Sequence, residues 1–219
     1  KSRQDQEEKI IAETLKLASL LPTEQRKALR QDVSSMENLN KEAKESDNTI
    51  FSSVRYGNVI ASRGSFIPLW MNLIKSSKVV PVTDLECSRF LFTLDDAVDT
   101  VLGALDLAQG GEVFIPKIKS YDLQTVLDSL KVLCKTEDIK YTIVNMRPGE
   151  KIHEDMLAMT ELDFTYEASD KLLVVTPQYT RKSHTYSIKY QGPHFNSSLH
   201  LSQDSLELAE LIKEGTKDK

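Results

Sequence analysis

Two arginines of this chain have side chains with the chemistry to bind phosphate groups. Arg89 opens the extended segment "RFLF", and Arg147 follows "YTIVNM" immediately before a Pro-Gly turn. An arginine stays charged at physiological pH and offers forked donors to phosphate oxygens. The alternative is that each arginine pairs with a surface carboxylate such as Glu86 or Glu150. Spacing alone favours these ion pairs.

A second stretch with binding chemistry is "VRYGNVIASRGSFIPLW", which joins a strand-like run to a helix-like run. Gly57 and Gly64 lack side chains and allow backbone amides to come close to a ligand. Arg63 and Ser65 add donors near the start of the following helix, and a helix N-terminus favours anions. The alternative is a tight strand–helix connection in which the glycines only satisfy backbone geometry.

The remaining reactive side chains indicate no further site. His153 lies beside Glu154, and we expect this pair to orient its loop rather than bind a metal. His184, His194 and His200 lie in a polar tail without metal-ligand spacing, so we interpret them as surface residues. The sequence has neither a P-loop nor a G-x-S-x-G nucleophile motif.

Composition excludes several classes of function. The 219 residues carry a formal net charge of −5, which gives no electrostatic reason to expect nucleic acid as a partner. No apolar run approaches the roughly 20 residues of a membrane span, and the charged N-terminus does not resemble a signal peptide. Cys87 and Cys134 are far apart. We therefore expect reduced thiols and a cytoplasmic location.

The elements that must position these residues fall into three regions. Residues 1–47 contain no glycine, and apolar residues such as Ile10, Leu17 and Leu21 roughly follow helical spacing. This first region is expected to be helical. It is either a cover packed on its own domain, which is the simpler interpretation, or a hairpin for oligomerisation or partner binding.

Residues 48–160 alternate between strand-like and helix-like segments, which predicts α/β architecture. A helix capped by Ser120, and a short helix after the Pro-Gly turn that follows Arg147, are among the expected elements. Residues 161–219 form a looser extension. It is predicted to contain a strand pair and a terminal helix capped by Ser202.

Four segments in order resemble one known family: "FSSVRYGNVIASRGSFIPL", "TDLECSRFLFTLDDAVDTVLGAL", "GGEVFIPK" and "VNMRPGEKIHEDML". They are similar to the second half of the CapD type of polysaccharide biosynthesis proteins. These are extended short-chain dehydrogenases/reductases that act as UDP-N-acetylhexosamine 4,6-dehydratases or epimerases. The sequence departs from the family where Ala61 replaces a usual glycine and Cys87 a common methionine. The paired glycines usual before "PVTD" are also missing.

The resemblance implies the substrate-binding half of a Rossmann-type fold and assigns roles to particular residues. It places Arg89 and Arg147 in a clamp for the diphosphate of a UDP-sugar, in one pocket with Asn58. It places Tyr56 against the nicotinamide of the cofactor. It also implies that three further residues bind the substrate, namely Arg63, Ser65 and Glu150.

The sequence also lacks two features of the family's catalytic half. NAD(P) binds there to a Gly-rich turn, but no glycine precedes Gly57, and no tyrosine is followed by lysine at the fourth position. We therefore expect a UDP-N-acetylhexosamine-binding part that has no catalytic residues and does not bind NAD(P) alone. Its expected protein partner is a second copy or a chain that carries the Rossmann half. The alternatives are a non-catalytic sugar-nucleotide-binding protein and a protein-interaction module.

Overall fold

The computed structural model describes residues 50–62, 64–177 and 184–216. The helical segment expected over residues 1–47 and the site residue Arg63 lie outside these ranges. In the described part of the chain, no helix is long and apolar enough to cross a membrane. The helices are α4 (Phe66–Lys75), α5 (Leu94–Leu107), α6 (Leu123–Cys134), α7 (Ser205–Gly215) and the 3₁₀ helix η1 (Met159–Phe164). The strands are β1 (Ser53–Val54), β2 (Asn58–Val59), β3 (Val80–Val82), β4 (Ser88–Phe92), β5 (Val113–Pro116), β6 (Ser120–Asp122), β7 (Tyr141–Ile143), β8 (Asp155–Leu157), β9 (Thr165–Glu167), β10 (Leu172–Val175) and β11 (Phe195–Asn196).

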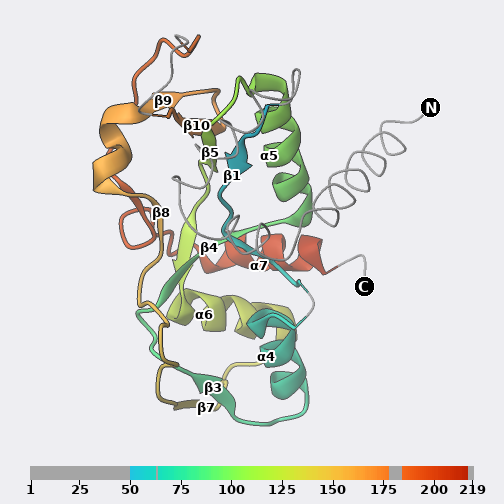
Figure 1. Ribbon diagram of the computed structural model, residues 1–219. Helices are drawn as coiled ribbons and strands as arrows, with labels where there is room; N and C mark the ends of the chain where they lie inside the picture. Colours follow the sequence, from blue (N-terminus) through green and yellow to red (C-terminus); the bar gives the residue numbers. More distant parts are fainter. Residues whose placement is uncertain (1–49, 63, 178–183, 217–219) are drawn as a thin grey trace, which may run out of the picture.

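The first layer is a mixed sheet with strand order β1-β5-β10-β9. β1 runs parallel to β5, and β10 runs antiparallel to both β5 and β9. Every residue of β5 and β10 is buried, because α5 lies toward one face of these strands and β8 and β11 contribute residues to the other. Such double coverage explains why both strands are continuous apolar runs rather than alternating ones. Figure 1 shows this sheet and α5 at the upper end of the molecule.

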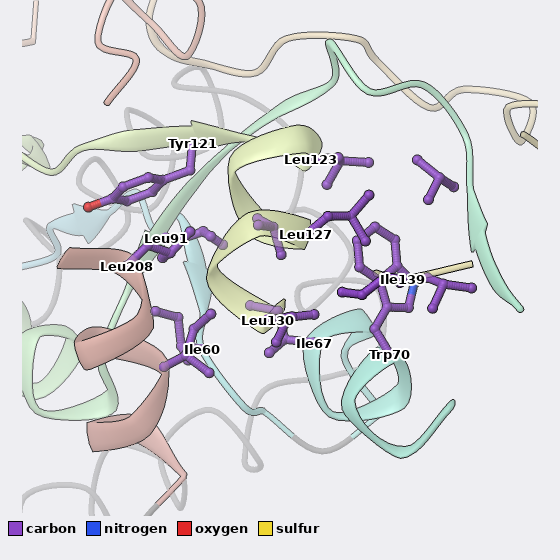
Figure 2. Packing of buried hydrophobic residues seen from close by; sticks show 14 of the residues in the cluster. Ile60, Ile67, Trp70, Leu91, Tyr121, Leu123, Leu127, Leu130, Ile139 and Leu208 are labelled. Carbon is purple, nitrogen blue, oxygen red and sulfur yellow. The ribbon is translucent and has the colours of Figure 1, made fainter. Parts of the chain in front are cut away.

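The second layer is built on α4, α6 and α7, and its interior is called the helical core here (Figure 2). Its largest members include Trp70 of α4, Leu127 and Leu130 of α6, and Leu208 of α7. α7 comes from the end of the chain, yet it lies between the upper sheet and the α4–α6 layer (Figure 1). The small sheets β2-β4-β6 and β3-β7 complete this layer. The residues that close the helical core are Ile60, Ile67, Val80, Val82, Cys87, Leu91, Tyr121, Leu123, Val126, Ile139 and Ile212.

The structure confirms the α/β class and the expected strand pair β9–β10 but corrects three local expectations. Ser120 lies in β6, and Asp122 caps α6 by accepting a hydrogen bond from the Thr125 N–H at 2.6 Å. Likewise Asp204, and not Ser202, caps α7. The short helix expected after the Pro-Gly turn is the strand β8 instead, because it pairs with β11 and buries two apolar side chains.

Candidate functional site

Gly57, the first glycine of the turn after β1, is required because the backbone of another strand packs closely against it. A Cβ atom at Gly57 would lie 2.5 Å from the carbonyl oxygen of Phe90 and 2.9 Å from Ile118 Cδ1. A real side chain cannot occupy that space, so Gly57 allows strand β4 to pass closely beneath the turn. This contact supports the packing interpretation of Gly57 that the sequence left open.

The other end of the turn has the backbone conformation that glycine favours. Ala61 adopts φ +58° and Gly64 adopts φ +78°. The left-handed φ of Ala61 explains why related sequences usually have glycine at this position. Ser65 then occupies the N-cap position of α4, and its Oγ is buried without a hydrogen-bond partner in the described part of the chain.

Tyr56 and Asn58 present their side chains to solvent at this turn. Tyr56 is 47% exposed, and its ring lies 5.8 Å from the ring of Phe92. Partial burial raises the pKa of Tyr56 above its usual value. Asn58 is exposed and pairs through β2 with Leu91 of β4. Both side chains are therefore accessible to a ligand.

Arg89, at the start of β4, is held by two backbone carbonyl oxygens and two carboxylates. Its Nη1 donates to the carbonyl oxygens of Ser88 at 2.8 Å and Ile152 at 3.1 Å. Its Nη2 lies 3.3 Å from a carboxylate oxygen of Glu150, and its Nε lies 3.5 Å from one of Glu154. The guanidinium side chain is only 12% exposed. The ion pair with Glu150 that the sequence allowed is therefore present, and Glu154 joins it.

Glu150 joins the two arginines of the predicted clamp. One of its oxygens contacts the Arg89 guanidinium, and the other accepts the backbone N–H of Arg147 at 3.1 Å. Gly149, at φ +84°, lies in the tight turn between Arg147 and Glu150. The side chain of Arg147 is exposed, and no ion pair of this side chain is found among the described residues. Burial raises the pKa of Glu154, while Arg89 and Lys151 oppose that rise.

A buried polar cluster that no sequence pattern indicated lies next to Arg89. Ser88, Ser120 and Ser197 are at most 1% exposed, and they connect β4, β6 and the C-terminal extension. Ser88 Oγ lies 2.6 Å from Ser197 Oγ and 2.8 Å from Nδ1 of His153. Ser120 Oγ donates to the carbonyl oxygen of Ser197 at 2.5 Å. Serine is common in loops, so its type and spacing alone could not indicate this cluster.

Arg55, within the "VRYGN" segment, also has a role that the sequence analysis missed. Its two terminal nitrogens each lie 2.7 Å from one carboxylate oxygen of Glu161 in η1, and Nη1 also donates to the carbonyl oxygen of Met156. This forked arrangement ties β1 to the segment that follows β8. Arg55 is thus engaged by the protein itself.

The histidines are less exposed than the sequence analysis expected. His184 packs against Tyr166 and Tyr186, and the ring of His200 lies 3.9 Å from that of Phe195. Burial lowers the pKa of His200. No group of three or more potential metal ligands occurs among residues 50–62, 64–177 and 184–216.

Comparison with known proteins identifies the family. The sequence profile of the family "Polysaccharide biosynthesis protein" matches residues 27–176. UDP-N-acetylglucosamine 4,6-dehydratase (inverting) of Campylobacter jejuni strain 81-176 is 40% identical over 120 residues, which cover 54% of this chain and 34% of that protein. The capsular polysaccharide biosynthesis protein CapD of Staphylococcus aureus is 44% identical over 118 residues, which cover 52% of this chain and 20% of CapD. The chain thus spans between a fifth and about a third of the length of these two relatives.

One solved structure has a similar fold. Pen from Bacillus thuringiensis superposes with a TM-score of 0.69 at 30% sequence identity, over 83% of this chain and 55% of Pen. The resemblance found in the four sequence segments is confirmed by the profile match. This chain belongs to the polysaccharide biosynthesis protein family, whose profile matches more than half of its residues.

Proposed function

We propose that this chain provides the sugar-nucleotide-binding part of a nucleotide-sugar 4,6-dehydratase or epimerase, with a UDP-N-acetylhexosamine as its ligand. The observation that carries the proposal is the position of Glu150, whose carboxylate contacts the Arg89 guanidinium and accepts the backbone N–H of Arg147. The Arg89 side chain is fixed and largely buried, whereas the side chain of Arg147 is exposed on the adjoining turn. One rigid and one accessible guanidinium suit a ligand with two phosphate groups.

The ion pairs of Arg89 would allow a phosphate group to replace one of its carboxylate partners. Glu150 and Glu154 are acceptors of the guanidinium at 3.3 and 3.5 Å, so neither contact is as short as a strong charge-assisted bond. A phosphate oxygen could replace Glu150 while the two carbonyl contacts keep Arg89 in place. The raised pKa of Glu154 also makes that carboxyl easier to neutralise when a second negative group arrives.

The turn between β1 and α4 is proposed to form the other side of the site. The start of α4 favours negative charge, and the Ser65 hydroxyl there has no partner among the described residues. Asn58 and Arg63 are proposed to contact the ligand from this turn. The exposed ring of Tyr56 is the proposed contact for the nicotinamide of an NAD(P) that is bound by the chain carrying the Rossmann half.

The dinucleotide itself does not fit the residues present. Binding of its pyrophosphate requires a glycine-rich turn after a strand, and no glycine precedes Gly57. We therefore expect no NAD(P) binding by the 219-residue chain alone. Cofactor absorbance retained through purification of the chain would contradict this expectation.

The test is titration calorimetry of the full chain with UDP and with UDP-N-acetylglucosamine. R89A and R147A should each weaken UDP binding about 10- to 100-fold, because a charge-assisted bond contributes about 1.5–3 kcal/mol. R89K should recover only part of the loss, since an ammonium group cannot fork across two oxygens. K131A removes a cation that pairs with Asp128 on α6 and serves as the control.

Two results would decide against the proposal. If the unmodified chain binds neither ligand at millimolar concentration, it does not provide a sugar-nucleotide site by itself. If it binds UDP and both R89A and R147A bind equally well, the arginines do not form the clamp. Arg147 is exposed, so its replacement should leave the fold intact and keep the test interpretable.

A further inference from the structure

The C-terminal extension reaches the start of β4 through a buried chain of hydrogen bonds. The backbone N–H of Glu154 donates to Ser197 Oγ at 2.8 Å, and the Ser197 N–H donates to the Glu154 carbonyl oxygen at 2.8 Å. Ser197 Oγ then contacts Ser88 Oγ, which contacts His153 Nδ1. Ser197 therefore fixes the residues on either side of Arg89: Ser88 on its own strand and Glu154 on the facing loop.

The direction of these bonds follows from the number of protons each group carries. Ser197 Oγ accepts from the Glu154 N–H and has one proton of its own to donate. Its nearer acceptor is Ser88 Oγ at 2.6 Å, against 3.3 Å for the Ser88 carbonyl oxygen. Once Ser88 accepts that proton, its own hydroxyl proton is directed to His153 Nδ1. A neutral His153 must then carry its proton on Nε2.

Nε2 of His153 has no hydrogen-bond partner among the described residues. It is also absent from their set of buried polar atoms without a partner, so the protein does not enclose it. It is thus a donor held in a fixed orientation and open to a ligand. The loop that carries His153 also supplies Glu150 and Glu154 to Arg89. Ser88 is only 1% exposed, which excludes it as a nucleophile and leaves the orientation of His153 as its role.

We propose that His153 is a further contact of the sugar nucleotide, donating from Nε2–H to a phosphate or sugar oxygen. Ser197 is the positioning residue that holds His153 in this tautomer through Ser88. This inference rests on the proposed function, because it places the donor beside the Arg89–Arg147 clamp. It also makes the C-terminal extension part of the binding site, a role that no motif in that extension indicates.

The first test is the tautomer itself, measured by histidine-ring ¹H–¹⁵N correlation NMR on the full chain near pH 7.5. The signal of His153 is assigned by its loss in H153F, and it should show the Nε2–H form. S197A should introduce the Nδ1–H form, because Ser88 then lacks its donor. S129A is the matched control: Ser129 is also fully buried, but its hydroxyl donates to Thr125 within α6. A His153 ring that carries its proton on Nδ1, or that is unchanged in S197A, overturns the relay.

The second test is UDP affinity in two variants of His153. H153F removes the donor and should weaken UDP binding about tenfold, the effect of one hydrogen bond to a charged group. H153Q places an amide donor near the former Nε2 and should bind within about threefold of the unmodified chain. If UDP binds and depends on Arg147 but H153F binds equally well, only this inference is wrong. If the unmodified chain does not bind UDP at all, the proposed function fails and the ligand contact fails with it.

Discussion

Arg55 shows that an arginine in a binding-like motif can serve the fold. Its guanidinium holds both oxygens of Glu161 at 2.7 Å, and the Ala158 N–H donates to the same carboxylate. Burial alone would raise the pKa of Glu161, but the bonds from Arg55 and Ala158, with the Arg55 charge, outweigh it and lower that pKa. The carboxylate therefore stabilises the folded chain only while it is ionised.

This coupling predicts a pH dependence of stability. A folded-state pKa below the ordinary glutamate value of about 4.3 gives a stabilisation that is complete above that pH and is lost as pH falls through the folded pKa. The free energy of unfolding should therefore fall as the pH is lowered below the ordinary glutamate pKa, as measured by urea titration. E161Q should remove part of this slope, whereas D163N in the same 3₁₀ helix should keep it. Equal slopes in E161Q and the unmodified chain would contradict the ion pair.

Gly57 and Gly64 allow the steric and the conformational need for glycine to be tested separately. G57A would place a Cβ against the backbone of Phe90, so we expect a loss of about 2–3 kcal/mol or more in the free energy of unfolding. G64A has open space around its Cβ but keeps a left-handed φ, so about 1–2 kcal/mol is expected. Thermal melts of both variants measure the difference. A G57A variant as stable as the unmodified chain would show that the turn and β4 can separate without cost.

At the scale of elements, the N-termini of α6 and α7 depend on aspartates. Asp204 Oδ1 accepts the N–H groups of Leu206 and Glu207 at 3.1 and 2.9 Å. D204A should therefore lower the free energy of unfolding by about 1 kcal/mol. D204N retains an oxygen that can cap the helix and should cost much less. Circular dichroism melts of both variants provide the measurement, and equal losses would mean that the charge of Asp204, rather than its cap, is what matters.

The sequence predicted those elements whose signals are local. α4 and the pair β9–β10 were expected from apolar patterning, and the left-handed φ of Ala61 fits the glycine that relatives usually have there. β8 was expected as a helix, because its strand character comes from pairing with β11, about 40 residues away in sequence. The Ser88–Ser197 contact has the same cause, since 109 residues separate its partners. Long-range pairing of this kind leaves no periodic pattern in the sequence.

At the scale of the whole molecule, the end of the chain completes a core begun near residue 60. Leu208 and Ile212 of α7 are fully buried in the helical core, one turn apart, whereas Leu206 is 64% exposed. I212A should lower the free energy of unfolding by about 2–5 kcal/mol, and L206A should change it little. Denaturant titration of the two variants tests this, and a stable I212A variant would show that α7 is dispensable.

The residues after position 160 pack with earlier parts of the chain. The division into three regions therefore stays a prediction. Residues beyond 160 supply both β10, which pairs with β5, and α7, which packs beside α6. Their composition suggested a loose extension, but they are interleaved with earlier residues in both layers. No local feature of residues 161–219 could reveal which strand or helix they would meet.

Trp70 gives the chain an optical reporter for one layer alone. It is the only tryptophan of the sequence, it is 4% exposed, and its ring meets that of Phe66 edge-on at 5.1 Å in the helical core. Indole emission should shift to longer wavelength when water enters the α4–α6–α7 layer, and it should report little of the upper sheet. Far-ultraviolet dichroism follows all elements together. The two curves coincide only if both layers unfold in one step, so a single spectrophotometric comparison reveals whether the sheet and the helical core are one cooperative unit.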